Sequence, residues 1–356
     1  MKNDAQFILN DFTREELAKK LPSLGIDPSK VGRIISRVHR SARTDDISAW
    51  AREKIGSRAL FALKDAGAVC GRIAIVTRRH CAADNFQKYV MRLSDGMCIE
   101  AVRIPLPAGP MARPDHYVAC VSSQVGCALG CSFCATGRAG FSRNLAAWEI
   151  VEQVAAIRAD SPEAPVSGIV FMGMGEPFLN YDAVLRAADI LSEPAGLAIA
   201  KKSMTISTAG IVPGIRRFTD EGRKLRLAVS LTSAIEEKRV SLMPVGLRYP
   251  LAELVDAARA YCQKSRERVV FEYVMISGLN VGREDAQALI ELLRGLRLRL
   301  NLIEVNDATG RFIPPGNDEY TRFRKWLNPL DAPIVRRYSG GREINAACGM
   351  LAADIS

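Results

Sequence analysis

CVSSQVGCALGCSFCATGRAGFSRNL, residues 120–145, is the stretch on which the fold and chemistry of this chain depend. At its centre Cys127, Cys131 and Cys134 follow a CxxxCxxC spacing. Three thiolates this close can bind three irons of a [4Fe–4S] cluster. The next cysteine downstream is Cys262, so the fourth iron has no local ligand and stays open to a substrate. Zinc is the main competitor, but structural zinc sites use four protein ligands, and no histidine follows residue 116.

Strands and helices alternate on the C-terminal side of this stretch. Short apolar segments predict strands at residues 117–122, 166–172, 202–208, 225–231, 268–276, 298–305 and, last, near 333–338. The intervals are long enough for helices, as at residues 146–158, 181–192, 211–221, 250–264 and 284–296. Repeated β-then-α units predict a parallel sheet covered by helices. The first six units are fewer than the eight of a closed barrel, so we expect an α/β fold, a partial (β/α)6 barrel over residues 116–356.

Two smaller units are predicted before the barrel. Residues 1–85 are expected to form a helical N-terminal domain, in which Asp27-Pro28 is a helix-start signal. Residues 86–115 are expected to form a β-hairpin extension that turns at Asp95-Gly96, followed by a Pro/Gly-rich linker at 107–115.

The charge of the chain favours a polyanionic partner. The net charge is +10, and residues 1–120 hold 20 basic and 13 acidic side chains, so most of the excess lies in the first third. Such a field favours RNA or DNA as a partner. Lys30, Arg33, Arg37 and Arg40 fall on one face of a predicted helix. From the pattern alone, this face is either a phosphate-binding surface or a solvated one.

Composition excludes several classes of protein. The hydrophobic fraction of 48% and charged fraction of 25% are ordinary for a globular chain. No apolar run reaches the length of a membrane span, and the polar N-terminus has no signal-peptide core. We therefore expect a cytoplasmic protein that does not bind a membrane and keeps its nine cysteines reduced.

The cysteine triplet after the first barrel strand resembles the mark of the radical S-adenosylmethionine (SAM) superfamily. That resemblance implies a [4Fe–4S] cluster held by Cys127, Cys131 and Cys134, and SAM bound to the open iron. The segment 173–177, GMGEP, resembles the superfamily's glycine-rich SAM motif, in which Gly175 and Glu176 would meet the SAM amino group. Ser207 and Ser230, at the ends of the next two strands, suit further contacts to SAM.

The longer stretch is more specific and resembles the RNA adenosine methyltransferases of the RlmN/Cfr family. Further segments match in order: FMGMGEPFLN (171–180), STAGIVPGI (207–215), SLMPV (241–245), EYVMISGLN (272–280), NLIEVN (301–306) and INAACGMLA (344–352). The resemblance covers roughly residues 85–356, with an RNA-binding helical domain expected ahead of it.

The family's chemistry assigns roles to three more residues. The C2 and C8 atoms of adenine have no nucleophilic lone pair, so a radical must deliver the methyl carbon. By resemblance, Cys348 carries the methyl group, and Cys120 helps to remove the ring proton and resolves the protein–RNA adduct through a disulfide with Cys348. Glu100 matches the family's acid that assists proton handling.

Two departures from the family pattern concern the SAM pocket. Asn306 matches a SAM-contacting asparagine, but Asp307 stands where the family usually has proline. The usual Ser-Leu-His is Ser230-Leu231-Thr232 here, and Thr232 is expected to supply a hydroxyl in place of the imidazole. These departures bear on the substrate and do not affect the five cysteines.

The leading hypothesis is a radical SAM enzyme that methylates C2 of an adenosine in 23S rRNA, with a tRNA adenosine as a second target. Flavodoxin or ferredoxin is the expected electron donor, and DNA is not expected as a partner. Methylation at C8, and a divergent paralogue that applies the two-cysteine chemistry to a non-RNA substrate, remain open alternatives. A non-enzymatic RNA-binding module is disfavoured by the open iron and the Cys120/Cys348 pair.

Overall fold

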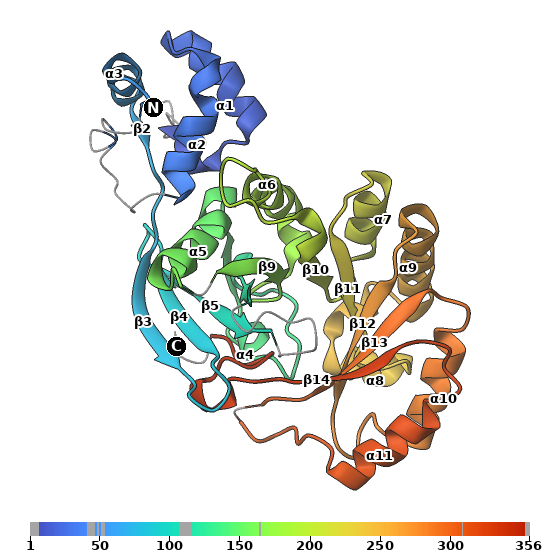
Figure 1. Cartoon of the computed structure of the whole chain (residues 1–356). Coiled ribbons are helices and arrows are strands. Elements are labelled where there is room, and N and C mark those ends of the chain that lie inside the picture. Colours follow the sequence, from blue (N-terminus) through green and yellow to red (C-terminus); the bar gives the residue numbers. More distant parts are fainter. Residues whose placement is uncertain are drawn as a thin grey trace.

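A ten-stranded sheet forms the centre of the molecule (Figure 1). The computed structural model describes residues 7–40, 47, 50, 54–106, 116–163, 165–307 and 309–352, so the predicted linker at 107–115 lies outside the described residues. In space the strands follow the order β14-β13-β12-β11-β10-β9-β6-β5-β4-β3. The sheet begins and ends on different strands, so the barrel is open, as predicted.

Seven consecutive strands of this sheet, from β6 to β14, run parallel to one another. They are β6 (Tyr117–Cys120), β9 (Val166–Phe171), β10 (Met204–Thr208), β11 (Arg226–Ser230), β12 (Val269–Met275), β13 (Leu298–Glu304) and β14 (Ile334–Arg337). Each overlaps a predicted strand, including the last one. The parallel strands bring their carboxyl ends to one edge of the sheet, where ligands bind in such folds.

Most of the helices cover the outside of this sheet (Figure 1), whereas the short helix α4 (Ala135–Arg138) follows the cysteine loop and contacts the C-terminal segment. The other helices are α5 (Ala147–Asp160), α6 (Tyr181–Leu191), α7 (Val212–Asp220), α8 (Glu236–Leu242), α9 (Leu251–Ser265), α10 (Arg283–Leu292) and α11 (Asn317–Trp326). The sequence did not predict α4, α8 or α11. Helix α11 has few apolar residues, and Phe323 is its buried residue. Within the described ranges, no helix is both long and apolar enough to cross a membrane.

The predicted hairpin is part of the main sheet. Its strands β4 (Gln87–Arg92) and β5 (Cys98–Pro105) are antiparallel, and β5 pairs with the first barrel strand, β6. A further strand, β3 (Ala74–His80), pairs with β4 at the sheet edge. The expectation of helix through residue 85 is therefore wrong from Ala74 onward. Most side chains of β3 are exposed, so the strand lacks the alternating burial that a sequence pattern reveals.

The N-terminal unit packs around its own apolar core. Its elements are β1 (Phe7–Ile8), α1 (Arg14–Lys20), α2 (Val31–Arg40), α3 (Ser57–Asp65) and β2 (Ala68–Val69). The predicted apolar stripe of α2 is confirmed: Val31, Ile34, Ile35 and Val38 are buried. The opposite, basic face is partly used within the chain. Lys30 donates to the carbonyl of Ile55 at 2.6 Å and Arg33 to that of Lys54 at 2.9 Å.

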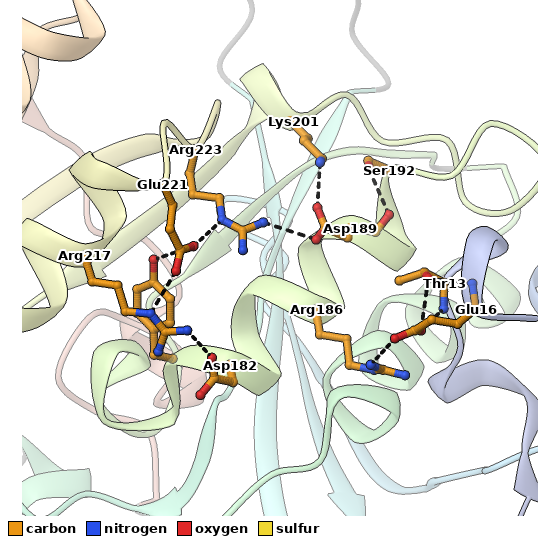
Figure 2. Close-up of polar contacts among 11 residues, drawn as sticks. Thr13, Glu16, Asp182, Arg186, Asp189, Ser192, Lys201, Arg217, Glu221 and Arg223 are labelled. Carbon is orange, nitrogen blue, oxygen red and sulfur yellow. Dashed lines mark hydrogen bonds and ion pairs between the residues drawn. The ribbon is translucent and has the colours of Figure 1, made fainter.

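Ion pairs join this unit to the barrel. Arg186 of α6 donates to Glu16 of α1 at 2.6 Å, and Glu16 also closes the capping box of α1 with Thr13 (Figure 2). Further along α6, Asp189 forms ion pairs with Lys201 at 2.5 Å and with Arg223 at 3.3 Å (Figure 2). Helix α6 is thus held by ion pairs on both sides, as the cationic partner toward the N-terminal unit and as the anionic partner at Asp189.

Candidate active site

The three motif cysteines lie on a loop that is closed at both ends. Two short antiparallel strands flank it, β7 (Gln124–Gly126) and β8 (Phe141–Asn144), and Cys127 N–H donates to the carbonyl of Gly140 at 2.7 Å. Gly126 has φ +77°, and a Cβ there would lie 1.9 Å from the Gly140 oxygen. Only glycine permits this closure. The loop is therefore shaped by its backbone before any ligand is considered.

A cavity of about 180 Å³ lies at the carboxyl ends of the parallel strands and gathers most of the predicted site. Its lining includes these predicted residues: Cys127, Cys131, Cys134, Gly175, Glu176, Ser207, Ser230, Asn306 and Cys348. They come from five separate strand–helix connections and from the C-terminal segment. The fold thus brings together residues that are more than 200 positions apart in the sequence.

Burial disfavours free thiolates in this cavity, so these cysteines are suited to bind a positively charged metal centre. Burial raises the pKa of Cys127 to about 11 and raises that of Cys131 further, and the neighbouring Cys134 sulfur adds to both shifts. An iron centre would compensate these negative charges. In the described ranges no three His, Cys, Asp or Glu side chains are grouped to hold a single metal ion, whereas all three thiols border one cavity. This donor set fits an iron–sulfur cluster held by three cysteines.

Glu176 forms the wall beside the cysteines. One carboxylate oxygen accepts from Phe178 N–H at 3.0 Å and the other from Ala209 N–H at 2.7 Å. Burial raises its pKa to about 7, although these backbone donors oppose the shift. Gly175 precedes it at φ +98°, where a Cβ would meet Gln124 at 2.5 Å. An amino group entering the cavity would give this buried carboxylate a charged partner.

Two buried oxygens in the lining are without a hydrogen-bond partner within the described structure. They are Oδ1 of Asn306 and Oε2 of Glu272. The amide nitrogen of Asn306 is occupied, since it donates to Ser339 at 2.8 Å and to the Cys348 carbonyl at 3.4 Å. Buried polar atoms are normally satisfied. These two acceptors therefore fit a ligand with donor groups, such as the hydroxyl and amino groups of SAM.

A second, smaller cavity of about 100 Å³ adjoins the first and contains the predicted cysteine pair. Cys120, at the end of β6, and Cys348 both line it as free cysteines, and Cys348 lines the first cavity as well. Burial raises the pKa of Cys120 to about 12, the Cys348 sulfur adds to this, and Arg337 opposes it. Burial also raises the pKa of Cys348, again opposed by Arg337. Solvent still reaches Cys348 through the cavity.

The segment that carries Cys348 is tied to the cysteine loop. Ala135 N–H, directly after Cys134, donates to the Gly349 carbonyl at 2.7 Å. The Thr136 hydroxyl donates to the Leu351 carbonyl at 2.8 Å. The position of Cys348 is therefore set by the same loop that would hold the cluster.

Two predicted site residues lie outside both cavities. Thr232 is fully buried at φ +60°, and its hydroxyl has no partner in the described structure. Glu100 forms a fully buried ion pair with Lys88 at 2.9 Å and accepts from Ala352 N–H at 2.7 Å. Glu100 thus contacts the C-terminal segment at Ala352.

Sequence reasoning missed two charged residues that line the site, Arg337 and Glu272. Arg337 of β14 borders both cavities and donates to Glu272 of β12 at 3.2 Å. Asn301 also donates to Glu272, at 3.0 Å. A carboxylate within the apolar strand VVFEYVM and an arginine at the end of the last strand were the available signals, since a buried charge needs a partner or a function.

The fold and the three-cysteine site define a radical SAM protein, and residues 121–293 match the family model described as the radical SAM superfamily. A "Probable RNA methyltransferase" of Myxococcus xanthus (strain DK1622) is 48% identical over 347 residues, covering 97% of this chain and 94% of the relative. A "Dual-specificity RNA methyltransferase RlmN" of Syntrophotalea carbinolica (strain DSM 2380 / NBRC 103641 / GraBd1) is 37% identical, covering 99% and 91%. The crystal structure of a radical SAM methyltransferase from Sphaerobacter thermophilus matches with a TM-score of 0.88 at 37% identity, covering 98% of this chain and 99% of that one.

The chain belongs to the RlmN-type family of radical SAM RNA methyltransferases. It is therefore a SAM-dependent enzyme, and the family implies a [4Fe–4S] cluster, SAM and an RNA substrate.

Proposed function

We propose that this enzyme methylates C2 of an adenosine in 23S rRNA, with a tRNA adenosine as a second target, in the cytoplasm. The observation that carries the proposal is the position of Cys348, which lines both the cavity of the cluster cysteines and the cavity of Cys120. A methyl carrier must reach SAM on one side and a resolving thiol on the other. The reactive radical comes from one-electron reduction of SAM at the cluster, with flavodoxin or ferredoxin as the proposed donor.

The proposed roles of the two cysteines follow a balanced sequence. Cys348, once deprotonated, would take the methyl group of SAM and release S-adenosylhomocysteine. The adenosyl radical from a second, one-electron-reduced SAM would take one hydrogen atom from that methyl group. The remaining carbon radical would bond to C2 of the adenine. The adduct would then pass its unpaired electron to a one-electron acceptor, a role that the oxidised cluster would supply, and its C2 proton to Cys120, which would release it to solvent. Cys120, as a thiolate, then attacks the Cys348 sulfur, so that a disulfide forms and the sulfur–carbon bond breaks. The released carbon takes a proton and becomes the methyl group of the product.

Arg337 supports the two thiol steps by its position. Its guanidinium lies beside both sulfurs and favours their thiolate forms against the effect of burial. For SAM, we propose contacts from Gly175, Glu176, Ser207, Ser230 and Asn306. Thr232 and Glu100 line neither cavity. For these two residues we therefore propose structural roles rather than contact with SAM or the substrate.

The N-terminal unit is the proposed RNA-binding part. Its basic face is less available than the sequence pattern implied, because Lys30 and Arg33 bind backbone carbonyls. Charge reversal at Arg33 and Arg37 should still weaken RNA binding and flatten its salt dependence. Unchanged affinity would exclude this face.

The test is anaerobic incubation of the reconstituted enzyme with reductant, methyl-deuterated SAM and unmodified ribosomal and transfer RNA, followed by mass spectrometry of the nucleosides. Labelled 2-methyladenosine is expected. Labelled 8-methyladenosine would overturn the C2 assignment, and SAM cleavage without labelled nucleoside would overturn the RNA assignment. Cys348→Ala should lose methyl transfer but still cleave SAM slowly, whereas the control Cys262→Ala, a buried thiol outside both cavities, should keep both activities.

A further inference from the structure

Arg239 of α8 is a fully buried arginine whose hydrogen-bond acceptors in the described part of the chain are all uncharged. Its guanidinium donates to the carbonyl of Ser230 at 2.9 Å, to that of Ala209 at 2.6 Å and to that of Leu231. It also contacts the Met243 sulfur at 3.6 Å. Burying a cation among neutral groups is expensive, so its retention at this position needs an explanation.

The location of the guanidinium relates it to the cluster cysteines. Ala209, Ser230 and Met243, which it contacts, all line the cavity that contains the three motif thiols. Arg239 therefore lies directly behind the wall of that cavity. Burial lowers its pKa to about 10, and the Cys131 sulfur opposes this shift more strongly than the carboxylate of Glu236 does. The group whose negative charge would act most strongly on the guanidinium is thus on the cavity side.

We propose that Arg239 is the counter-charge of the iron–sulfur cluster and raises its reduction potential. This inference rests on the cluster of the proposed function. Three thiolates leave the bound cluster anionic, and each electron that it accepts from a low-potential donor adds one negative charge. A fixed cation behind the wall stabilises the reduced state more than the oxidised state, because Coulomb attraction grows with the charge. Second-shell charge of this kind tunes cluster potentials.

The competing explanation is that Arg239 only clamps the loops after β10 and β11 by binding their carbonyls. Two variants separate the explanations. Arg239→Lys keeps the charge but loses part of the clamp, whereas Arg239→Gln loses the charge. Glu236→Gln removes the carboxylate that competes for the guanidinium, and a glutamine can still accept the Leu251 N–H that Glu236 binds at 2.9 Å.

The measurement is a potentiometric titration of the reconstituted holoenzyme without SAM or RNA, followed by the EPR signal of the reduced cluster. At a fixed potential, Arg239→Gln should lower the ratio of reduced to oxidised cluster about tenfold, which for one electron corresponds to about 59 mV. Glu236→Gln should raise the ratio, and Arg239→Lys should stay close to the wild type. Arg158→Gln is the matched control, because Arg158 also binds carbonyls, those of Leu197 and Val166, but neither of these two residues lines the cavity.

Several outcomes would overturn the inference. One is an unchanged potential in Arg239→Gln at wild-type iron and sulfide content, and another is an equal drop in Arg239→Lys and Arg239→Gln. If Arg239→Gln does not fold, an unchanged or lowered potential in Glu236→Gln refutes the counter-charge by itself. A wild-type chain that assembles no cluster would instead refute the cofactor of the proposed function.

Discussion

The buried ion pair between Lys88 of β4 and Glu100 of β5 gives a sharp test of how the Cys348 segment is held. Both side chains are fully buried, 2.9 Å apart. Lys88 also donates to the Asn345 carbonyl at 3.0 Å, and Glu100 accepts from Ala352 N–H at 2.7 Å. The pair therefore connects the hairpin to both sides of Cys348. Removing Lys88 would leave the Glu100 charge buried without its cation.

We expect Lys88→Met to lower the free energy of unfolding by about 3 kcal/mol. Loss of one partner from a buried ion pair costs about 3–5 kcal/mol, and the lower end applies because Glu100 keeps the Ala352 N–H as a donor. The double variant Lys88→Met/Glu100→Gln should recover part of the loss, since no charge then remains buried. Denaturant unfolding of the three proteins at pH 7 measures both effects.

Lys19→Met provides the control for this experiment. Lys19 pairs with Glu15 at 2.6 Å, but both side chains are mostly exposed, and pairs of this kind contribute at most about 0.5 kcal/mol. Proteolysis should in addition cut the Cys348 segment of Lys88→Met faster than that of the wild type. If Lys88→Met is as mild as Lys19→Met, or if the double variant is less stable than Lys88→Met, the hairpin does not anchor the segment in this way.

Three other changes have defined outcomes. His39 is buried in α2, and burial, with a smaller effect of Arg72, lowers its pKa to about 4. As pH falls below 6.5, the unfolded chain binds a proton that folded His39 refuses, so the protein should lose about 2.5 kcal/mol between pH 7 and pH 4.5. That part of the loss should be absent in His39→Asn, as measured by denaturant unfolding at both pH values. Gly126→Ala should prevent closure of the cysteine loop at φ +77° and reduce the iron and sulfide bound per chain several-fold, whereas Gly96→Ala, in an open turn at positive φ, should bind the wild-type amount. Arg186→Met should loosen the contact of α1 with α6 by removing the 2.6 Å pair with Glu16 and expose the N-terminal unit to proteolysis; an unchanged cleavage rate would show that this ion pair is not needed to hold the two parts together.

The parallel strands and the cluster loop were predictable because each has a strong local signal. Strand β12 is a nearly continuous run of buried residues. The cluster loop carries its signal within eight residues, because the spacing of its three cysteines indicates an iron–sulfur cluster. Strand β3 was missed because its outward side chains are polar and its pairing with β4 is decided by tertiary structure. Helix α8 was missed for a related reason: it is short, and one of its two buried residues, Arg239, is charged.

The positions of single side chains were less predictable than the elements that carry them. Thr232 was expected in the SAM pocket from its place in a motif, but its backbone turns into the left-handed region at φ +60°, and its hydroxyl lies outside the cavity. The proton-handling role predicted for Glu100 stays a prediction, and the structure adds that Glu100 pairs with Lys88 and accepts from the Ala352 amide. Both positions depend on contacts with residues distant in sequence, which a motif does not encode.

The open barrel explains why an antiparallel hairpin is joined to a parallel sheet in this chain. The sheet ends at β14 on one edge and at β3, next to the hairpin, on the other. The C-terminal segment after β14 runs beside the hairpin (Figure 1). Gly341 N–H donates to Asp84 at 2.8 Å just after β14, and Lys88 holds the segment further on. The cluster loop secures it from the other side through Ala135. The Cys348 segment is therefore held on one side by the cluster loop and on the other by the hairpin. A further strand–helix unit would place its helix on the outside of the sheet and would not supply this second contact.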